Sequence, residues 1–305
     1  MITSAQNARV KAVVALQQKS AERRRTGLFV VEGQRELEHC VEAGLEVQEV
    51  FVCEEIAGME GCDKIAAHSG LQIGDGGLQS VGGGLQSVGD GGLQSVDGGL
   101  QSVGDGGLRS GGAVVRVSRA VYEKMAYRGG TEGVMAVVRS RVLGLEDLRL
   151  GESPLVVVVE RVEKPGNLGA ILRSADAAGA DAVVVCDALT DLWNPNLVRS
   201  SIGAVFTVPT VVCGSEECIA FLKGKGIQIL TAQLQDSCLY YDTDMRRGTA
   251  IVMGTEATGL TEVWRRAADA HIRIPMLGRL ESRNVSVSAA ERLFEAVRQR
   301  EGERP

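Results

Sequence analysis

Aromatic residues are scarce in this 305-residue sequence: two Trp, four Tyr and five Phe make up 4 % of it. This scarcity argues against a nucleic-acid surface dominated by base stacking on aromatic rings. The sequence also has no apolar run near the roughly 20 residues that a membrane-spanning helix needs, and its first residues lack the apolar core of a signal peptide. We therefore expect a cytoplasmic protein that does not contact a membrane.

Signatures of metal and nucleotide sites are missing as well. The cysteines form no CxxC pair, and the three histidines are scattered, so we expect no metal site. An odd number of cysteines in mostly apolar contexts indicates buried, reduced thiols, at positions 40, 53, 62, 186, 213, 218 and 238. Neither GxGxxG nor GxxxxGK[ST] occurs, which leaves a nucleotide-dependent oxidoreductase or a P-loop enzyme without support.

Glycine, in contrast, is in excess, and the excess is local. Of the 39 glycines, 16 lie at positions 74–112, where GGLQSV recurs with leucines at 78, 85, 93, 100 and 108. One apolar pair in each unit cannot offset the backbone entropy lost on ordering such a segment. We predict a flexible insertion whose deletion leaves the function intact, with a small glycine-rich β-stack as the alternative.

Apolar patterning predicts two α/β domains. A small first domain spans 1–140, interrupted by the 74–112 insertion, and a charged linker at 141–153 leads to a second domain at 154–305. In the first domain we expect strands at 29–31, 47–52, 113–117 and 134–138, and helices at 34–43 and 119–126.

The second domain alternates short apolar runs with helix-like segments, which is typical of a mainly parallel sheet with helices on its faces. The runs lie at 155–159, 182–186, 205–212, 227–231, 250–253 and 271–275. We expect the last helix to start at a capping box formed by Ser288 and Glu291 and to bury Leu293, Phe294 and Val297.

Four segments at the predicted carboxyl ends of strands carry glycine and polar residues, and ligands of parallel sheets bind at such ends. They are KPGNLGAILR at 164–173, SIGAVF at 201–206, GTEATGL at 254–260, and IPM at 274–276 leading to SRNVSVS at 282–288. In order and spacing, the first, third and fourth resemble the three motifs of the SpoU (TrmH-like) family of RNA ribose 2′-O-methyltransferases, in the SPOUT superfamily. The first half resembles that family's ribosomal-protein-like substrate-binding domain, at 29–33 and 133–138.

The resemblance implies a C-terminal trefoil knot, S-adenosylmethionine bound in a bent form, and an active site completed across a homodimer. It also implies the site residues. The catalytic set is Asn167, Arg173, Glu256, Ser282 and Asn284; the cofactor-binding set is Thr231, Gly254, Ile274, Met276 and Arg283. Two positions depart from the family, because Ala257 and Arg283 stand where glycine and leucine are usual. If the side chain at 283 packs against the cofactor, the arginine should weaken binding.

The expected chemistry is attack of a ribose 2′-hydroxyl on a sulfonium methyl group. A guanidinium group stays protonated in proteins, so we expect Arg173 to hold phosphate or stabilise the nascent alkoxide rather than act as a base. Asn167, near a predicted helix N-cap, could orient Arg173. The local alternatives are an ion pair of Arg173 with Asp176, an N-cap role for Asn167, and turn roles for Ser282 and Asn284. Glycine at 254 would let a ligand approach the backbone.

RNA contact is expected from local charge, because the sequence pI of about 5.3 argues against indiscriminate binding. The first 30 residues supply a basic arm, with a solvated helix face as the alternative: Arg9, Lys11, Lys19, Arg23, Arg24 and Arg25. A substrate-binding domain in front favours ribosomal RNA over transfer RNA, by analogy only. The competing function is a non-catalytic RNA-binding or ribosome-assembly factor on the same fold.

Overall fold

The computed structural model describes residues 1–58, 72–73, 113–127, 132–255, 257–279 and 283–301. The predicted insertion at 74–112 and two of the candidate site residues, Glu256 and Ser282, lie outside these ranges. None of the helices within them is both long and apolar enough to cross a membrane.

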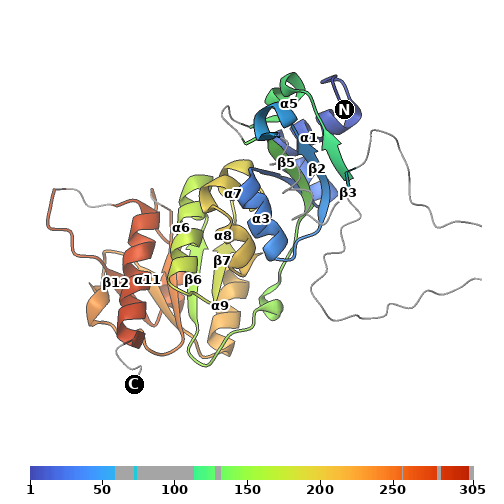
Figure 1. Ribbon diagram of the computed structural model, residues 1–305. Helices are drawn as coiled ribbons and strands as arrows, with labels where there is room; N and C mark the ends of the chain where they lie inside the picture. Colours follow the sequence, from blue (N-terminus) through green and yellow to red (C-terminus); the bar gives the residue numbers. More distant parts are fainter. Residues whose placement is uncertain (59–71, 74–112, 128–131, 256, 280–282, 302–305) are drawn as a thin grey trace, which may run out of the picture.

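The first sheet has five strands in the order β1-β5-β2-β4-β3 (Figure 1). Strand β5 runs antiparallel to β1 and β2, whereas β2, β4 and β3 are parallel. The elements in chain order are α1 (Ala8–Gln18), α2 (Ser20–Thr26), β1 (Leu28–Glu32), α3 (Gln34–Glu42), β2 (Val47–Val52), β3 (Gln72–Ile73), β4 (Ala113–Arg116), α5 (Arg119–Met125) and β5 (Val134–Arg139). The strands and helices predicted for this region are confirmed to within one residue at each end.

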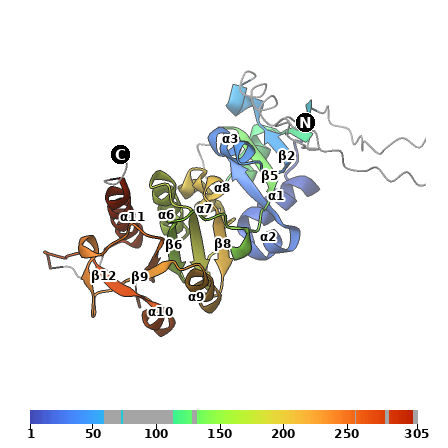
Figure 2. The ribbon, with the colours of Figure 1, turned by 90° about the horizontal axis from the view of Figure 1, so that it is seen from below.

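The second sheet has seven strands in the order β10-β12-β9-β11-β6-β7-β8, and every pairing is parallel. Its elements are η1 (Leu145–Asp147), β6 (Leu155–Glu160), α6 (Pro165–Ala177), β7 (Ala182–Cys186), α7 (Pro195–Ser201), α8 (Ala204–Thr207), β8 (Thr210–Cys213), α9 (Ser215–Gly224), β9 (Gln228–Ala232), β10 (Cys238–Leu239), η2 (Tyr240–Asp242), β11 (Thr249–Met253), α10 (Glu262–Ala267), β12 (Ala270–Arg273) and α11 (Val285–Glu301). Helices α6, α7, α8 and α11 cover one face, and α9 and α10 cover the other (Figure 2). This confirms the predicted parallel sheet with helices on both faces.

Two details of the second domain were predicted wrongly. The apolar run at 205–212 is not one strand: Gly203, at φ +88°, leads into the short helix α8, and β8 begins only at Thr210, after Pro209. The last helix begins at Val285 rather than at Ser288, because the Asn284 Oδ1 accepts a hydrogen bond from the Ser286 N–H at 2.9 Å and caps the helix.

This helix also buries a different face from the one predicted. Leu293 is fully buried against α6, but Phe294 is one residue, or about 100°, further around the helix and is 48 % exposed. Val297 is half-buried. An apolar side chain on α11 therefore remains at the surface.

The two sheets are joined by a continuous apolar cluster. It includes side chains from α3 and β1 on one side and from α7 and α8 on the other. The ring of Phe29 stacks on that of Trp193 at 4.4 Å and lies 6.0 Å from that of Phe206. At Gly203, a Cβ atom would lie 2.7 Å from the imidazole ring of His39, so the glycine allows α3 to pack close to the turn before α8.

The predicted basic arm is largely structural. Arg23 is 4 % exposed; its Nε pairs with Asp191 Oδ2 at 2.6 Å, and its Nη1 donates to the carbonyl oxygens of Leu16 and Gln17. Arg25 pairs with Glu22 on the same helix, and Arg9 pairs with a glutamate of β2. The members of the arm that remain exposed outside any ion pair in the described ranges are Lys11, Lys19 and Arg24.

Residues 141–153, predicted to be a linker, lie against the second sheet. Leu145 and Leu148 are buried in the cluster on the α9 side, and Leu143 forms an isolated parallel bridge with Val211. This segment therefore adds to the apolar core of the second domain.

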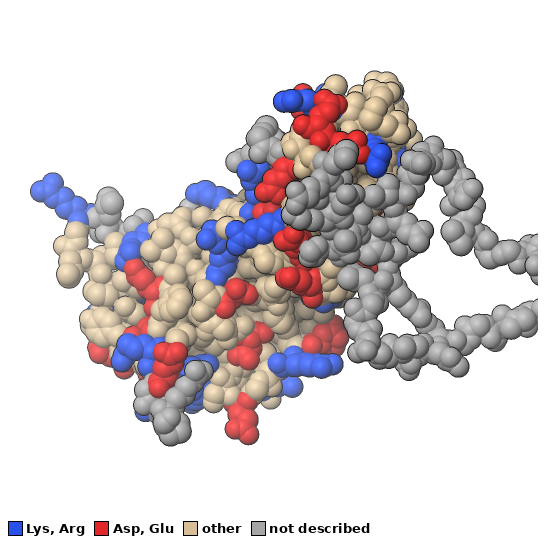
Figure 3. Space-filling model, viewed as in Figure 1, with Lys and Arg blue, Asp and Glu red and all other residues tan. Residues whose placement is uncertain are grey.

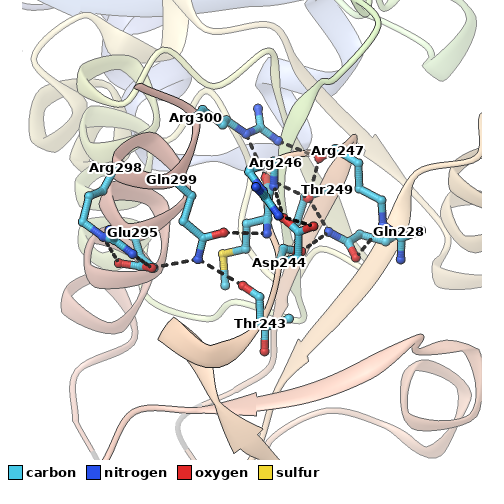
Figure 4. A network of polar contacts seen from close by, with 11 residues as sticks. Gln228, Thr243, Asp244, Arg246, Arg247, Thr249, Glu295, Arg298, Gln299 and Arg300 are labelled. Carbon is cyan, nitrogen blue, oxygen red and sulfur yellow. Dashed lines mark hydrogen bonds and ion pairs between the residues drawn. The ribbon is translucent and has the colours of Figure 1, made fainter. Parts of the chain in front are cut away.

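A polar network holds the C-terminal end of α11 to the loop before β11 (Figure 4). The guanidinium of Arg300 donates to the carbonyl oxygens of Met245 and Arg247 in that loop, and to that of Ser153 at the start of the domain. The Gln299 amide accepts from the Met245 N–H at 2.8 Å and donates to the carbonyl of Thr243 at 3.0 Å. These bonds fix the far end of the helix whose first turns form one wall of the site described next.

Candidate active site

Three strand-end loops of the second sheet meet around one cavity of about 360 Å³. The cavity is lined by residues that follow β9, β11 and β12, and by the first two turns of α11. A second cavity of about 130 Å³ adjoins it, because both are lined by Gly254, Thr255, Ala257 and Val285; the smaller one also reaches Lys164 and Asn167 at the start of α6. All three sequence motifs therefore meet at this end of the sheet.

The loop after β11 is a tight turn that closes on itself. Thr255 and Gly259 exchange two backbone hydrogen bonds, at 3.2 and 3.1 Å, and Gly259 has a φ of +68°. A Cβ atom on Gly254 would overlap the backbone of Gly259 and lie 2.5 Å from the Leu260 nitrogen. Glycine is thus required at 254 by the fold of its own loop, a different reason from the ligand approach that we expected.

The loop is held from below by a buried carboxylate. Glu160, at the end of β6 and 1 % exposed, accepts hydrogen bonds from the N–H of Thr261 at 2.8 Å and from its hydroxyl at 2.6 Å. Buried charges need such partners. Glu160 therefore ties the end of this loop to β6, the strand next to β11, a role for which the sequence carried no signal.

Two asparagines join the first and third motifs. The Asn284 Nδ2 donates to the Asn167 Oδ1 at 3.1 Å, while the Asn284 Oδ1 caps α11. Lys164 is the N-cap residue of α6, so Asn167 lies in the first turn of that helix rather than at its cap. The contact connects the start of α6 to the start of α11 beside the smaller cavity.

Arg173 is placed differently from the other candidates. It lies six residues beyond Asn167 on α6, is exposed, and lines neither cavity. Within the described ranges it forms no hydrogen bond or ion pair, so the local alternative, an ion pair with Asp176, is not formed; Asp176 instead accepts from the Thr207 hydroxyl at 3.0 Å. The guanidinium is therefore available to a molecule outside this chain.

The cavity wall formed by α11 contains an arginine that we did not predict. Arg292 is 5 % exposed, and its Nη1 donates to the Ser288 carbonyl, but its buried Nε has no hydrogen-bond partner in the described structure. Burial lowers the pKa of Arg292 to about 10, which still leaves it protonated at neutral pH. A sequence signal existed, because position 292 falls on the apolar face of α11 with Val285, Ala289 and Ala296.

Arg283, the departure from the family pattern, also borders the cavity. Its side chain forms an ion pair with Glu291 at 2.6 Å and is 39 % exposed. The guanidinium group of Arg283 is thus held by Glu291, which lies in the second turn of α11. This pairing reduces the charge that position 283 would otherwise add to the wall.

The cavity suits a ligand with an apolar ring system and an anionic or hydrogen-bond-accepting group. Its described lining combines apolar side chains, such as Met253, Leu260 and Ile274, with exposed backbone groups of the loop and the unpaired Arg292 Nε–H. No carboxylate belongs to that part of the lining, which contains four arginines: 265, 273, 283 and 292. A volume of this size is in the range of small-molecule sites.

Comparison with known proteins agrees with this geometry. Residues 154–293 match the SpoU rRNA Methylase family, and residues 7–73 match the MRM3-like substrate binding domain. The 23S rRNA (guanosine-2′-O-)-methyltransferase RlmB of Bordetella pertussis is 37 % identical over 199 residues, 64 % of this chain and 81 % of that enzyme. The chain belongs to the SpoU rRNA methylase family.

Other members of the family extend the comparison. The 23S rRNA (uridine(2479)-2′-O)-methyltransferase of Streptomyces viridochromogenes is 35 % identical over 173 residues, 55 % of this chain and 60 % of that enzyme. The crystal structure of an RNA 2′-O ribose methyltransferase covers 98 % of both chains at 33 % identity and a TM-score of 0.74. The SpoU methyltransferase AviRb of S. viridochromogenes, in complex with the cofactor AdoMet, covers 98 % of this chain and all of its own at 25 % identity and a TM-score of 0.79.

Membership of the SpoU family confirms the predictions of a methyltransferase, of S-adenosylmethionine as its cofactor, and of an α/β catalytic domain behind a smaller one. Of the predicted cofactor-binding residues, four line the larger cavity: Gly254, Ile274, Met276 and Arg283. Thr231 does not; it is fully buried within the sheet, with its hydroxyl 2.6 Å from His271 Nδ1. The structure brings Asn167 and Asn284 together and leaves Arg173 apart from them.

Proposed function

We propose that this SpoU-family chain transfers the methyl group of S-adenosylmethionine to a ribose 2′-hydroxyl of ribosomal RNA, and that it acts in the cytoplasm. The observation that carries the proposal is the cavity where the three family motifs meet, with Asn167 and Asn284 in contact beside it. Ribosomal RNA is favoured over transfer RNA because the relatives described above are named as 23S rRNA methyltransferases.

In this proposal the cavity lined by Gly254, Ile274 and Met276 holds the cofactor, which when bound supplies an electrophilic methyl group. The Arg292 Nε–H donates to an acceptor atom of the cofactor, such as its carboxylate. The asparagine pair fixes the start of α6 relative to α11, so that the entering ribose meets a preformed wall. Glu256 and Ser282, outside the described ranges, remain candidates for polar contacts to that ribose.

Arg173 has a separate role in our proposal. Its protonated guanidinium holds the phosphate next to the target ribose and stabilises the negative charge that develops on the 2′-oxygen during attack. In this role the Arg173 guanidinium neither accepts nor gives up a proton during the reaction. Helices α6, α7 and α3 each present an exposed arginine, Arg173, Arg199 and Arg35, and basic side chains gather over these helices in Figure 3. This surface suits an RNA backbone that approaches the site.

We further propose that the active site is completed in a homodimer and that the C-terminal segment forms a trefoil knot, as in the family. Two observations support the dimer. Among the described residues Arg173 has no hydrogen-bond or ion-pair partner and lines neither cavity, and α11 exposes Val287 and Phe294, two turns apart on one face. An apolar face of this kind can be buried by a second copy. In our proposal Arg173 of one protomer then serves the cavity of its partner.

The proposed activity is tested with labelled S-adenosylmethionine and the purified full-length protein. We expect labelled methyl to enter ribosomal RNA and to map to a ribose 2′-oxygen, with much less label in transfer RNA. RNA binding without methyl transfer and without cofactor binding at millimolar concentration would instead support the non-catalytic assembly factor. Preferential labelling of transfer RNA would overturn the proposed substrate but not the reaction.

Replacing Arg292 with leucine should weaken S-adenosylmethionine binding by about ten- to a hundredfold, the value of a hydrogen bond to a charged group. The same change should leave the free energy of unfolding unchanged or raise it, because it removes an incompletely paired buried charge. Calorimetry and urea unfolding measure the two effects. Arg298→Leu, on the exposed face of the same helix, is the control, and equal affinity in both variants would remove Arg292 from the site.

Gly254→Ala should abolish measurable cofactor binding and destabilise the domain by about 1–3 kcal/mol, as overpacking does. The added Cβ would push the 254–260 loop away from its closed form, because it meets the backbone of Gly259. Gly166→Ala is the matched control, since its Cβ would meet open space. Normal binding by Gly254→Ala would show that the loop can open without loss of the site.

A further inference from the structure

Three cysteines from three different elements meet at the carboxyl ends of β7 and β8. Cys186 ends β7, Cys213 ends β8 in register with it, and Cys218 lies in α9, which packs on this face of the sheet. The three sulfur atoms all lie within 4.8 Å of one another. Spacing along the chain gave no sign of this cluster, because the parallel pairing of β7 with β8 creates it.

We propose that Cys186, Cys213 and Cys218 bind a thiophilic metal ion, with Zn²⁺ as the ion of choice. Zinc takes thiolate ligands at about 2.3 Å, which places tetrahedral sulfur neighbours about 3.8 Å apart. The observed separations therefore need only small side-chain movements. This site replaces the sequence-based expectation of reduced thiols without a metal.

The surroundings of the cluster favour ion binding over simple burial. Cys186 and Cys218 are fully buried, but Cys213 is half-buried, so the cluster has an open side. A cavity of about 580 Å³ lies beside this end of β7 and β8, and its lining includes Asp187 and Gly214, the residues that follow Cys186 and Cys213. Metal sites need both an entry path and a fourth ligand.

The fourth position is left to water, because the Asp187 carboxylate beside the cluster does not lie within 4.8 Å of all three sulfur atoms. Asp187 directly follows Cys186, its N–H donates to the Cys213 carbonyl at 3.0 Å, and its positive φ of 49° turns the chain at this point. The Ser215 hydroxyl donates to the Asp187 carboxylate at 2.5 Å and orients it.

The proposed ion would have a structural role distinct from methyl transfer. In the sheet order, β7 and β8 lie at the opposite end from β12 and β9, which border the cofactor cavity. The chain that leaves Cys186 leads to Asp191 and Trp193, which contact Arg23 and Phe29 of the first domain. A bound ion would therefore stabilise the segment on which the two domains meet.

Cobalt is a spectroscopic probe for this site, because thiolate ligands give Co²⁺ a charge-transfer absorption in the near ultraviolet. Full-length protein, stripped of metal with a chelator and kept reduced, should bind one Co²⁺ per chain with this absorption. Added Zn²⁺ should displace the Co²⁺ and raise the unfolding midpoint. Cys213→Ser should lose at least about tenfold in affinity and the rise in midpoint.

Two control variants show whether the cluster itself is the site. Cys40→Ser removes a buried thiol elsewhere and Cys238→Ser an exposed one, and both should bind as the unaltered protein does. The proposal is overturned if no charge-transfer absorption develops, or if Cys213→Ser binds with unchanged affinity. It is also overturned if the reduced protein converts two of the three thiols to a disulfide on exposure to peroxide and binds no ion beforehand.

Discussion

Arg173→Ala should lower the rate of methyl transfer to ribosomal RNA by about 10²–10³-fold and leave the Kd for S-adenosylmethionine unchanged. The size of the loss is that of removing one donor to a developing oxyanion. The unchanged Kd follows from the position of Arg173, which lines neither cavity of its chain. Single-turnover rates at saturating cofactor, with calorimetry of cofactor binding, measure the two quantities separately.

Two further variants show why Arg173 matters. Arg266→Ala removes an equally exposed arginine, one paired only with Glu262 on its own helix, and should retain full activity. Arg173→Lys keeps the charge but not the planar fork, and should recover only part of the rate. If Arg173→Ala loses activity and cofactor affinity in parallel, Arg173 has a binding role rather than the one proposed.

The same variant tests the composite active site. Arg173→Ala and Gly254→Ala are each expected to be inactive, for different reasons. If each site takes Arg173 from one protomer and the cofactor cavity from the other, mixed dimers contain one intact site, and mixing the two variants should restore activity. No recovery after confirmed subunit exchange would place both functions in a single chain.

The fold could be predicted from the sequence because its signals are local. Short β-branched runs such as Leu155–Val159 favour strands buried on both faces, and their alternation with helices indicates the parallel sheet. The segment at 274–276 could be placed at the end of a strand for the same reason, and strand-end loops of a parallel sheet meet at one edge. The expectation that Ile274 and Met276 bind the cofactor came from the resemblance to the SpoU family.

Other features depend on contacts between distant residues, which no local pattern records. The spacing of α11 places Arg292 on its apolar face, but no local pattern shows that this face borders the cavity. The clash at Gly254 arises from a loop that returns five residues later. Phe294 was predicted to be buried because an apolar residue near Leu293 fits a core, yet it is 48 % exposed in the part of the chain that the structure describes.

Arg23 illustrates the same limit and leads to the largest stability effect that we expect. In the sequence it is one of six cations in a basic arm; in the structure it is 4 % exposed and ties α2 to Asp191 of the second domain. Arg23→Ala should lower the free energy of unfolding by about 3–5 kcal/mol, because it leaves Asp191 partly buried without its counter-ion. It also leaves the carbonyls of Leu16 and Gln17 without a donor.

Urea unfolding of matched variants tests this value. Arg25→Ala removes an exposed pair on the same helix and should cost less than about 1 kcal/mol. Asp191→Ala combined with Arg23→Ala should lower the free energy of unfolding by less than the sum of the two single changes, because the second change removes a charge already left unpaired.

RNA binding distinguishes the structural role of Arg23 from a role in the basic arm. At a temperature where Arg23→Ala stays folded, its affinity for RNA should be unchanged. Arg24→Ala, at an exposed position, should instead weaken RNA binding and reduce its salt dependence. A weaker affinity in Arg23→Ala alone, at normal stability, would return Arg23 to the RNA-binding surface and remove it from the contact between the domains.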